Sequence, residues 1–542
     1  MKHRDRALTS ARVLWLPALL AAAVYARFLD GFWLGDDFSN VHRLWNADRG
    51  GVLWQQVAAQ FLAPIPSDGA FYRPVLIASM ALNQWLAGPE YPAWFALNLF
   101  LHAANVALVG VTVSAMAARC GRDGLRSGAG AAVLFALSPA LPEGVFWVSA
   151  RADAGVTLLT LAGVYAWVRA PEGSGRVFVL PLLLVVALGC KESAAVLPLQ
   201  MLLVAIAWPV RLTRAQIAAV AACFALVAAF LGARAYVFGD AWHVYRSDAA
   251  PSVLRLRDAV ASAVPWWHAL TAATPVLAKI YVALGAASTV LLAASLSGAR
   301  MRLAVALLLA AAGLAAATLL NLGGLSPSGE GGRLAYTPMA WLALALGVAG
   351  ATPLRDQRGR DPGRHSRRVG IVAMVATAVT GAFVLDRELL VAERAEHDVR
   401  ALATAIDGWA QTHAGLTLLV VAEHDGPVVT TRNAQGALVL PPVQSAPLLH
   451  RVLPTLPQEI PLRYDQLAAG LATRLDAMRP SQVDARVLDA LAEHDKARWP
   501  EHYACWSAAE RKIVVLPAPD AAVAANWVAS LDQAAARCGV RR

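Results

Sequence analysis

Charged residues are scarce in this chain. Of its 542 residues only 15% are Asp, Glu, Lys or Arg, whereas 58% are hydrophobic. A water-soluble globular surface does not tolerate that balance over such a length, which excludes a soluble enzyme or binding module. The net charge of +10 would suggest nucleic-acid binding in a soluble protein, but here we expect the arginines in membrane loops and no nucleic-acid partner. The composition predicts a polytopic α-helical membrane protein.

Cysteine is also rare, with five residues in the whole chain. Cys120, Cys190 and Cys223 fall in or beside apolar runs. No pair has the spacing of a zinc site or a CxxC motif, so those metal and redox motifs are absent. Cys505 and Cys538 lie in the polar tail, where an oxidising compartment would allow them to form a disulfide.

A signal-peptide cleavage site is missing as well. The basic N-terminus precedes an apolar run at 13–29, but no small-residue cleavage site follows that run. We therefore expect the run to be retained as the first membrane span, with its basic flank in the cytoplasm.

Long apolar runs are what the sequence does have. About eleven of them qualify to cross a hydrocarbon layer of ~30 Å, although several are short. They cover residues 13–29, 94–116, 129–141, 155–168, 177–189, 194–208, 217–238, 271–296, 303–322, 336–351 and 369–385.

Two stretches test this count. The run at 75–86 contains Asn83 and is too short to span, so we expect it to lie flat along the outer interface. The stretch 177–208 would be about 48 Å long as a single helix, which is too long even when tilted. We therefore expect it to break into two short helices at Lys191 and Glu192.

Arginines occupy alternate connections between the apolar runs, which orients the chain. By the positive-inside rule the arginine-rich loops face the cytoplasm. These loops lie at 119–126, 169–176, 211–214, 300–302 and 355–368. The other loops, and the chain beyond the last apolar run, then fall on the extracytoplasmic side.

The composition becomes polar and mixed after Leu385. This change predicts a transmembrane domain over 1–386 and an extracytoplasmic domain over 387–542. The tail has helical periodicity at 386–414 and 521–536 and buried-strand patterns at 416–422 and 513–516. We expect a small α/β domain there, and we find no catalytic constellation in it.

Ionisable and aromatic side chains gather at the outer ends of the spans. Charged groups at membrane depth are costly and usually face a cavity or a partner, so this gathering predicts a site on the outer face. The alternative is that outer loops simply carry some charge; Arg151 and Asp153 would then form a local ion pair at a helix start. The residues are Asp36, Asp37, Tyr72, Arg73, Glu143, Arg151, Asp153, Lys191, Glu192 and Arg333. A continuous helix over 143–151 would place Glu143, Trp147 and Arg151 on one face.

Short motifs carry these residues: GDDF at Gly35, FYRPV at Phe71, NLFLHAANV at Asn98, SPALPEGVFWVSARAD at Ser138, KESAAVLP at Lys191 and RLAYTP at Arg333. In this order and at these span ends they resemble the GT-C superfamily of membrane glycosyltransferases. Within it they are similar to the TMTC-type protein O-mannosyltransferases and their bacterial relatives. The resemblance extends over residues 13–350.

The resemblance implies a mannosyltransferase-like inverting enzyme that takes a monosaccharide from a polyprenyl-phosphate carrier on the extracytoplasmic face. The acidic pair of the family corresponds to Asp36 and Asp37, one of which would be the general base. A carboxylate within hydrogen-bond reach can take the proton that an acceptor hydroxyl loses as it attacks the anomeric carbon. A nearby negative charge also stabilises an oxocarbenium-like transition state.

The leaving group of such a reaction is a lipid phosphate, which needs cations rather than a proton. The candidate ligands of this phosphate are Arg73, Arg151, Lys191 and Arg333. Tyr72, Glu143, Asp153, Glu192 and Tyr336 are expected to line the cavity. For Arg234 we prefer snorkelling to the interface over a phosphate contact. His102 and Asn105 match the family pattern, and we expect them to bridge helices.

The sequence departs from the TMTC pattern at two points. It has no helical repeat of about 34 residues after the membrane domain, and Leu334 stands where the family has an aromatic residue. The acceptor therefore stays open between protein Ser/Thr and an envelope glycan or lipid. The sequence specifies no cofactor and leaves metal dependence open, since Asp36 and Asp37 could hold a divalent cation beside the donor phosphate.

A membrane transporter or lipid flippase is the competing prediction from another class. It would show repeated halves or paired broken helices with charges near the bilayer midplane, and the sequence has no visible repeat. The abundance of Ala, Leu, Gly and Arg indicates a bacterium with GC-rich DNA, and hence the inner membrane. The sequence names neither the sugar nor the acceptor.

Overall fold

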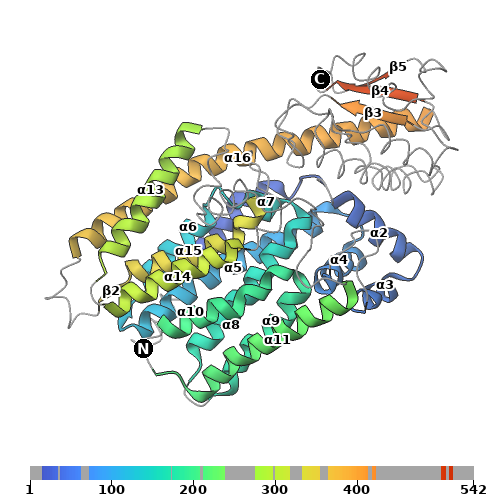
Figure 1. Cartoon of the computed structure of the whole chain (residues 1–542). Helices are drawn as coiled ribbons and strands as arrows, with labels where there is room; N and C mark the ends of the chain where they lie inside the picture. Colours follow the sequence, from blue (N-terminus) through green and yellow to red (C-terminus); the bar gives the residue numbers. More distant parts are fainter. Residues whose placement is uncertain are drawn as a thin grey trace, which may run out of the picture. The chain divides into compact units, whose positions relative to one another are not determined.

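The computed structural model describes residues 15–33, 37–62, 72–171, 174–207, 211–238, 275–296, 299–317, 332–353, 364–412, 418–422, 502–507 and 512–516 (Figure 1). The chain divides into two compact units. The first unit comprises Met1–Leu29 and Gly50–Leu389, and the second comprises Asp30–Arg49 and Leu390–Arg542. The sequence predicted a boundary after residue 386 and did not predict that the 30–49 segment would group with the tail.

The first unit is a bundle of apolar helices, and every predicted apolar run overlaps one of them. Four helices are long and apolar enough to cross a membrane, namely Tyr91–Arg119, Arg214–Tyr236, Val276–Ala294 and Arg364–Leu390, and the chain is an integral membrane protein. The bounds are Trp15–Phe28 for the first apolar helix, then α3 Leu53–Gln60, α4 Pro74–Ala87, α5 Tyr91–Arg119, α6 Leu125–Ala136, α7 Pro142–Phe146, η2 Val148–Ala150, α8 Arg151–Arg169, η3 Gly175–Phe178, α9 Val179–Cys190, η4 Glu192–Val196, α10 Leu197–Ala207, α11 Arg214–Phe238, α13 Pro275–Ala294, α14 Ala299–Ala317, η7 Gly332–Ala335, α15 Tyr336–Gly350 and α16 Arg364–Thr412.

Helix α15 is the core of this bundle. All of its residues except Thr337 are buried, and it contacts α5, α6, α8, α13 and α14. Its sequence is apolar on every side, as expected for a helix surrounded by other helices. Gly347 allows close packing, because a Cβ there would meet Val113 Cγ atoms at 2.7 Å. Small residues of this kind are what bring helix backbones together in a membrane.

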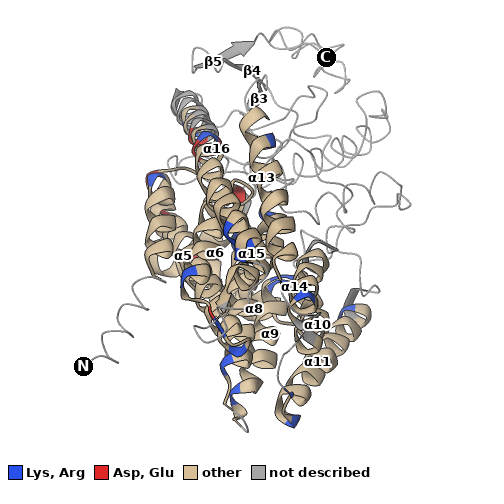
Figure 2. Ribbon diagram, turned by 90° about the vertical axis from the view of Figure 1, so that its left-hand side faces the viewer, with Lys and Arg blue, Asp and Glu red and all other residues tan. Residues whose placement is uncertain are grey.

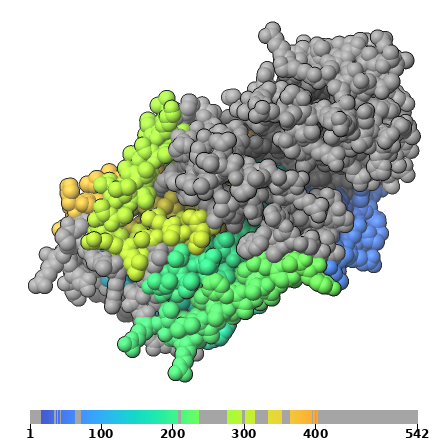
Figure 3. All heavy atoms as spheres, in the orientation of Figure 1, coloured from blue at the N-terminus to red at the C-terminus, as the bar shows by residue number. Residues whose placement is uncertain are grey.

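Helices on the outside of the bundle present apolar side chains outward. On α11 the side chains of Ile217 and Phe224 are exposed, and on α13 those of Val276 and Val290 are exposed. Both helices lie on the visible surface of the first unit (Figure 3). Few acidic residues interrupt the described helices (Figure 2). Large apolar side chains in contact with solvent are tolerated when that solvent is lipid.

The arginine-rich loops contact one another at one end of the bundle. Arginine side chains and an indole there donate to backbone carbonyls of neighbouring connections, and a short antiparallel ribbon pairs β1 (Arg122–Asp123) with β2 (Thr352–Pro353). Loops that the arginine pattern assigns to one side therefore do share one end. The bonds are Arg119 Nη2 to Ala170 O (3.1 Å), Arg122 Nη1 to Ala351 O (2.9 Å), Trp167 Nε1 to Gln216 O (3.4 Å) and Arg367 Nη2 to Ser295 O (3.4 Å).

The predicted break in the 177–208 stretch is confirmed. Helix α9 ends at Cys190, the extended residue Lys191 follows at φ −163° and ψ 144°, and η4 leads into α10. The break therefore places one basic and one acidic side chain next to each other between two apolar helices.

The continuous helix over 143–151 that would have placed Glu143, Trp147 and Arg151 on one face does not form. Pro142 starts α7, which ends at Phe146, and Trp147 is extended before α8 begins at Arg151. Asn98 of α5 accounts for this break, because its side-chain amide donates to the carbonyls of Val145, Trp147 and Val148 at 3.3, 3.1 and 3.5 Å. Carbonyls that lose their helical partners are costly in a membrane unless another donor reaches them.

The second unit contains α2 (Asp37–Arg49), the last part of α16 and a three-stranded sheet. Strand β3 (Leu418–Ala422) runs parallel to β4 (His502–Ser507), which is antiparallel to β5 (Lys512–Leu516). The strands predicted at 416–422 and 513–516 are confirmed, and β4 was not predicted. The predicted helix at 521–536 and Cys538 lie outside the described residues, as does the side chain of Cys505.

We predict that Asn98→Ala destabilises the protein more than Asn83→Ala does. Asn98→Ala removes the donor to three buried carbonyls, a loss of about 1–3 kcal/mol, whereas Asn83 makes a single bond to Ala93 O at 3.3 Å. Thermal unfolding of both purified variants in the same detergent compares them. Equal unfolding midpoints would contradict the role given to Asn98.

Candidate functional site

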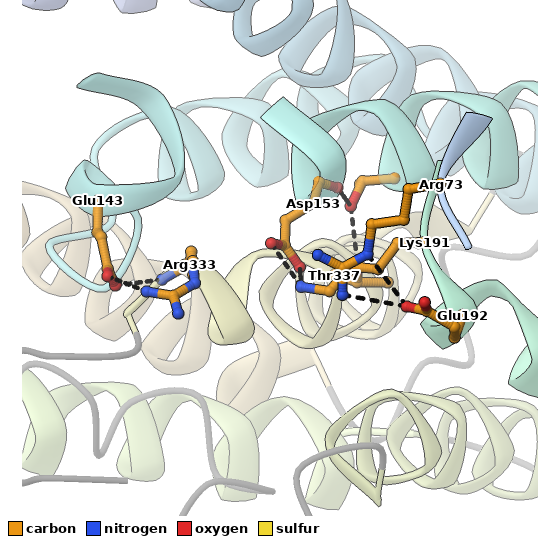
Figure 4. A network of polar contacts seen from close by, with 8 residues as sticks. Arg73, Glu143, Asp153, Lys191, Glu192, Arg333 and Thr337 are labelled. Carbon is orange, nitrogen blue, oxygen red and sulfur yellow. Dashed lines mark hydrogen bonds and ion pairs between the residues drawn. The ribbon is translucent and has the colours of Figure 1, made fainter. Parts of the chain in front are cut away.

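Residues predicted at the outer span ends meet in one polar network (Figure 4). They come from five separate places in the first unit. Arg73 precedes α4, Glu143 lies in α7, Asp153 lies in the first turn of α8, Lys191 and Glu192 lie at the break after α9, and Arg333 lies in η7. Three ion pairs connect them, and we refer to these six residues as the ion-pair network.

Lys191 and Asp153 form the central pair. The Nζ atom of Lys191 lies 2.6 Å from Asp153 Oδ1 and 2.7 Å from Oδ2. Both side chains are largely buried, with exposed fractions of 13% and 8%. Burial lowers the pKa of Lys191, Asp153 opposes this shift, and repulsion from Arg73 and Arg333 adds to it. The three cations are therefore close enough to act on one another.

Glu192 brings two arginines together. Its Oε2 accepts from Arg73 Nε and Nη2 at 3.2 and 3.1 Å, and its Oε1 lies 3.7 Å from Nη1 of Arg234. The backbone N–H of Tyr72 also donates to this carboxylate, at 3.4 Å. Arg234 is only 3% exposed, so the predicted snorkelling is wrong and its guanidinium belongs beside the network.

The third pair fastens η7 to α7. Arg333 Nη1 donates to Glu143 Oε1, and the backbone N–H of Arg333 donates to Oε2 at 2.9 Å. The guanidinium lies 4.5 Å from the ring centroid of Trp147, a cation–π contact. A Cβ on Gly144 would meet the ring of Tyr336 at 2.8 Å, so this close approach requires glycine. Glu143 and Trp147 thus share a partner although no continuous helix joins them.

Two threonines connect the central pair to α15. Thr157 Oγ1 donates to the carbonyl of Asp153 at 2.8 Å and lies 2.7 Å from Thr337 Oγ1. A hydroxyl has one proton, so Thr337 must donate to Thr157. Sequence analysis did not single out either threonine, since a hydroxyl within an apolar helix gives no distinctive signal.

Arg151 has a different environment from the other three candidate phosphate ligands. Its guanidinium donates to Asn98 Oδ1 at 2.8 Å, to Trp94 O at 2.9 Å and to Ser79 O at 3.3 Å. The alternative prediction of a local Arg151–Asp153 pair is wrong, because the carboxylate of Asp153 binds Lys191. Arg151 holds α4, α5 and α8 together.

Tyr336 and Tyr72 direct their hydroxyls away from the ion pairs. Tyr336 is fully buried and its hydroxyl lies 2.6 Å from His102 Nδ1, while Asn105 donates to that hydroxyl at 3.5 Å and to Ala154 O at 2.9 Å. This confirms that His102 and Asn105 bridge helices. The Tyr72 hydroxyl donates to Phe61 O at 3.0 Å.

The network suits an anion. With Arg234 it contains four basic and three acidic side chains, most of them largely buried. Among these described side chains the basic groups outnumber the acidic ones by one, and in surroundings of low dielectric constant such a cluster of cations favours a ligand with compact negative charge. Arginine presents a fork for phosphate oxygens and lysine presents a point charge.

The acidic pair lies in a different part of the chain. Asp37 is the first residue of α2 in the second unit and is 1% exposed. A carboxylate in the first turn of a helix is stabilised by the helix dipole. Asp36 lies outside the described residues.

Metal binding has no support from side-chain clusters. Within the described ranges, no group of three or more His, Cys, Asp or Glu side chains is placed to hold a metal ion. Cys120, Cys190 and Cys223 are free thiols.

Comparison with known proteins gives one distant structural likeness. No family profile and no curated protein matches the chain. The cryo-EM structure of the arabinofuranosyltransferase AftD from mycobacteria superposes with a TM-score of 0.42 and 17% sequence identity, over 78% of this chain and 31% of that one. This chain thus spans about a third of the length of that protein. A likeness at this TM-score carries no argument about function.

Proposed function

We propose that this protein is an inverting glycosyltransferase. It moves a monosaccharide from a polyprenyl-phosphate carrier to an acceptor hydroxyl on the extracytoplasmic face of the membrane. The acceptor is a protein Ser/Thr or an envelope glycan or lipid. The proposal includes mannosyltransferase-like specificity, the TMTC-type resemblance and a bacterial inner membrane location.

One observation supports this proposal above all. The FYRP, PEGVFWVSARAD, KES and RLAYTP motifs, chosen from sequence alone, contribute the three ion pairs of one largely buried network. Glu143 and Arg333 meet across a separation of 190 positions, which brings two of these motifs together. A transporter with charges in separate halves does not account for this convergence.

The proposed roles follow from charge. Arg73, Lys191 and Arg333, with Arg234, stabilise the phosphate of the donor and the negative charge that grows on it as the glycosidic bond breaks. Arg151 positions the helices that carry them. Glu143, Asp153 and Glu192 hold the cations in place, since each already accepts from one of them. One carboxylate of the acidic pair, Asp36 or Asp37, takes the proton of the acceptor.

The proposed topology has about eleven spans and a cytoplasmic N-terminus. The end of the bundle with the joined arginine loops faces the cytoplasm, and the C-terminal α/β domain lies outside. The contacts among those loops support a common end for them, and the sign of the charge supplies the side.

We predict that wild-type protein transfers radiolabel from at least one polyprenyl-phosphate sugar to a membrane extract, and that Asp36→Asn or Asp37→Asn abolishes transfer. Loss of the general base costs about a hundredfold or more in rate. Circular dichroism controls for folding. Equal transfer by the wild type and both variants would exclude the acidic pair as the base.

We predict that Lys191→Met raises the donor KM at least tenfold, because a charge-assisted contact to the phosphate is lost. It also leaves Asp153 uncompensated, which costs about 3–5 kcal/mol of stability. The double variant Lys191→Met/Asp153→Leu separates these effects. It should recover the unfolding midpoint but not the KM, whereas recovery of both would reduce Lys191 to a structural partner. Arg302→Ala, at the opposite end of the bundle, is the control.

We predict that labelling of single cysteines in spheroplasts with a membrane-impermeant maleimide will show the proposed orientation. In a background with all five native cysteines changed to serine or alanine, Ser481→Cys should react in intact spheroplasts. Asp123→Cys, which replaces an exposed residue of β1, should react only after lysis. The reverse pattern would overturn the proposed orientation.

A further inference from the structure

The segment that leads to α2 contacts α16 through its backbone. This contact lies wholly within the second unit, which contains both residues 30–49 and the part of α16 after Leu389. Two side chains of α16 make it, Glu396 and Arg400, which are four residues apart and therefore on one face of the helix. We call their contacts with residues 30–32 the α16 clamp.

Glu396 contributes a buried carboxylate to this clamp. Its residue is only 5% exposed although it lies on a long, highly charged part of α16. The backbone of Gly31 packs directly on that carboxylate, and a Cβ at position 31 would come within 2.9 Å of both Glu396 Cδ and Oε1. Only glycine fits this approach without moving the glutamate, so the sequence has glycine where the contact needs it.

Arg400 contributes donors from the same helix face. Its Nη2 donates to the carbonyl of Asp30 and, at 2.6 Å, to the carbonyl of Gly31. Its guanidinium also lies 5.3 Å from the ring centroid of Phe32, a cation–π distance. Two successive carbonyls and the next side chain are thus held by one arginine.

The clamp fixes the chain just before the acidic pair. Trp33, which follows the clamped residues, is 1% exposed, and α2 begins four residues later at the buried Asp37. Val41, Leu44 and Ala47 bury one face of α2.

We infer that Glu396 and Arg400 are positioning residues for Asp37 of the acidic pair, so that the extension of α16 beyond the membrane forms part of the machinery that aims this carboxylate. This inference rests on the proposed role of that pair. It assigns a task to a segment that the sequence placed in a separate tail domain.

Hydrogen–deuterium exchange of the full-length protein in nanodiscs tests the clamp without reference to activity. Arg400→Ala should accelerate amide exchange in peptides from residues 30–49 about tenfold, the effect of losing roughly one net hydrogen bond. Arg400→Lys should restore part of the protection, because an ammonium still donates to the carbonyls. His397→Ala is the matched control, since His397 is an exposed residue of the same part of α16. Exchange in Arg400→Ala equal to that in His397→Ala would overturn the clamp.

Transferase kinetics of the same variants test the positioning role. Arg400→Ala should lower kcat at least tenfold while the donor KM stays constant, and Arg400→Lys should recover part of kcat. Faster exchange with unchanged kcat would overturn the positioning role and leave a purely structural contact. Absence of transfer by the wild type with every donor would count against the proposed function and, with it, the positioning role, while the exchange result would still decide the clamp.

Discussion

The ion pair between Lys191 and Asp153 is the contact on which the ordered end of the bundle depends. It joins the break after α9 to the first turn of α8, at 2.6 Å and with little exposure of either side chain. Removing one partner would leave a buried charge uncompensated, at a cost of about 3–5 kcal/mol. Thr157 connects the same Asp153 residue to Thr337 of α15, and Glu192, next to Lys191 in the chain, pairs with Arg73.

The lipid environment explains why polar side chains form so many contacts at one end of the helix bundle. Lipid tails are as apolar as leucine, so burial of apolar surface does not drive helices together. Close contact at small residues such as Gly347 and Gly163, and bonds such as Asn98 to the carbonyls around Trp147, supply that association instead. A break in a helix leaves backbone groups without helical partners, and at the break around Trp147 the side chain of Asn98 from α5 supplies the missing donor. The helix break and the polar side chains near it therefore both reflect the requirement that polar groups in a membrane have hydrogen-bond partners.

Several features were predictable because they depend on local quantities. The break at Lys191 followed from helix length against bilayer thickness, and the common end of the arginine loops followed from charge alternation. Other predictions failed because they assumed that neighbours in sequence are partners. Asp153 binds Lys191 rather than Arg151. A continuous helix through Trp147 does not form, because the side chain of Asn98, which lies 50 positions before Val148, donates to the backbone carbonyls there. Strand β4 was not predicted, because its sequence, which contains His, Tyr, Cys and Trp, is not a simple apolar run.

The sequence by itself determined that the chain crosses a membrane and where most of its apolar helices lie, and it identified the polar residues that meet in the ion-pair network. These properties follow from hydropathy, length and charge, which need no knowledge of contacts. Only the tertiary structure decided which cation faces which carboxylate, that Arg234 joins Glu192, and that Glu396 and Arg400 hold the segment before the acidic pair. Such choices depend on how helices cross and rotate against one another. Many packings satisfy the same hydropathy pattern, so the pairing is decided only when the side chains interlock.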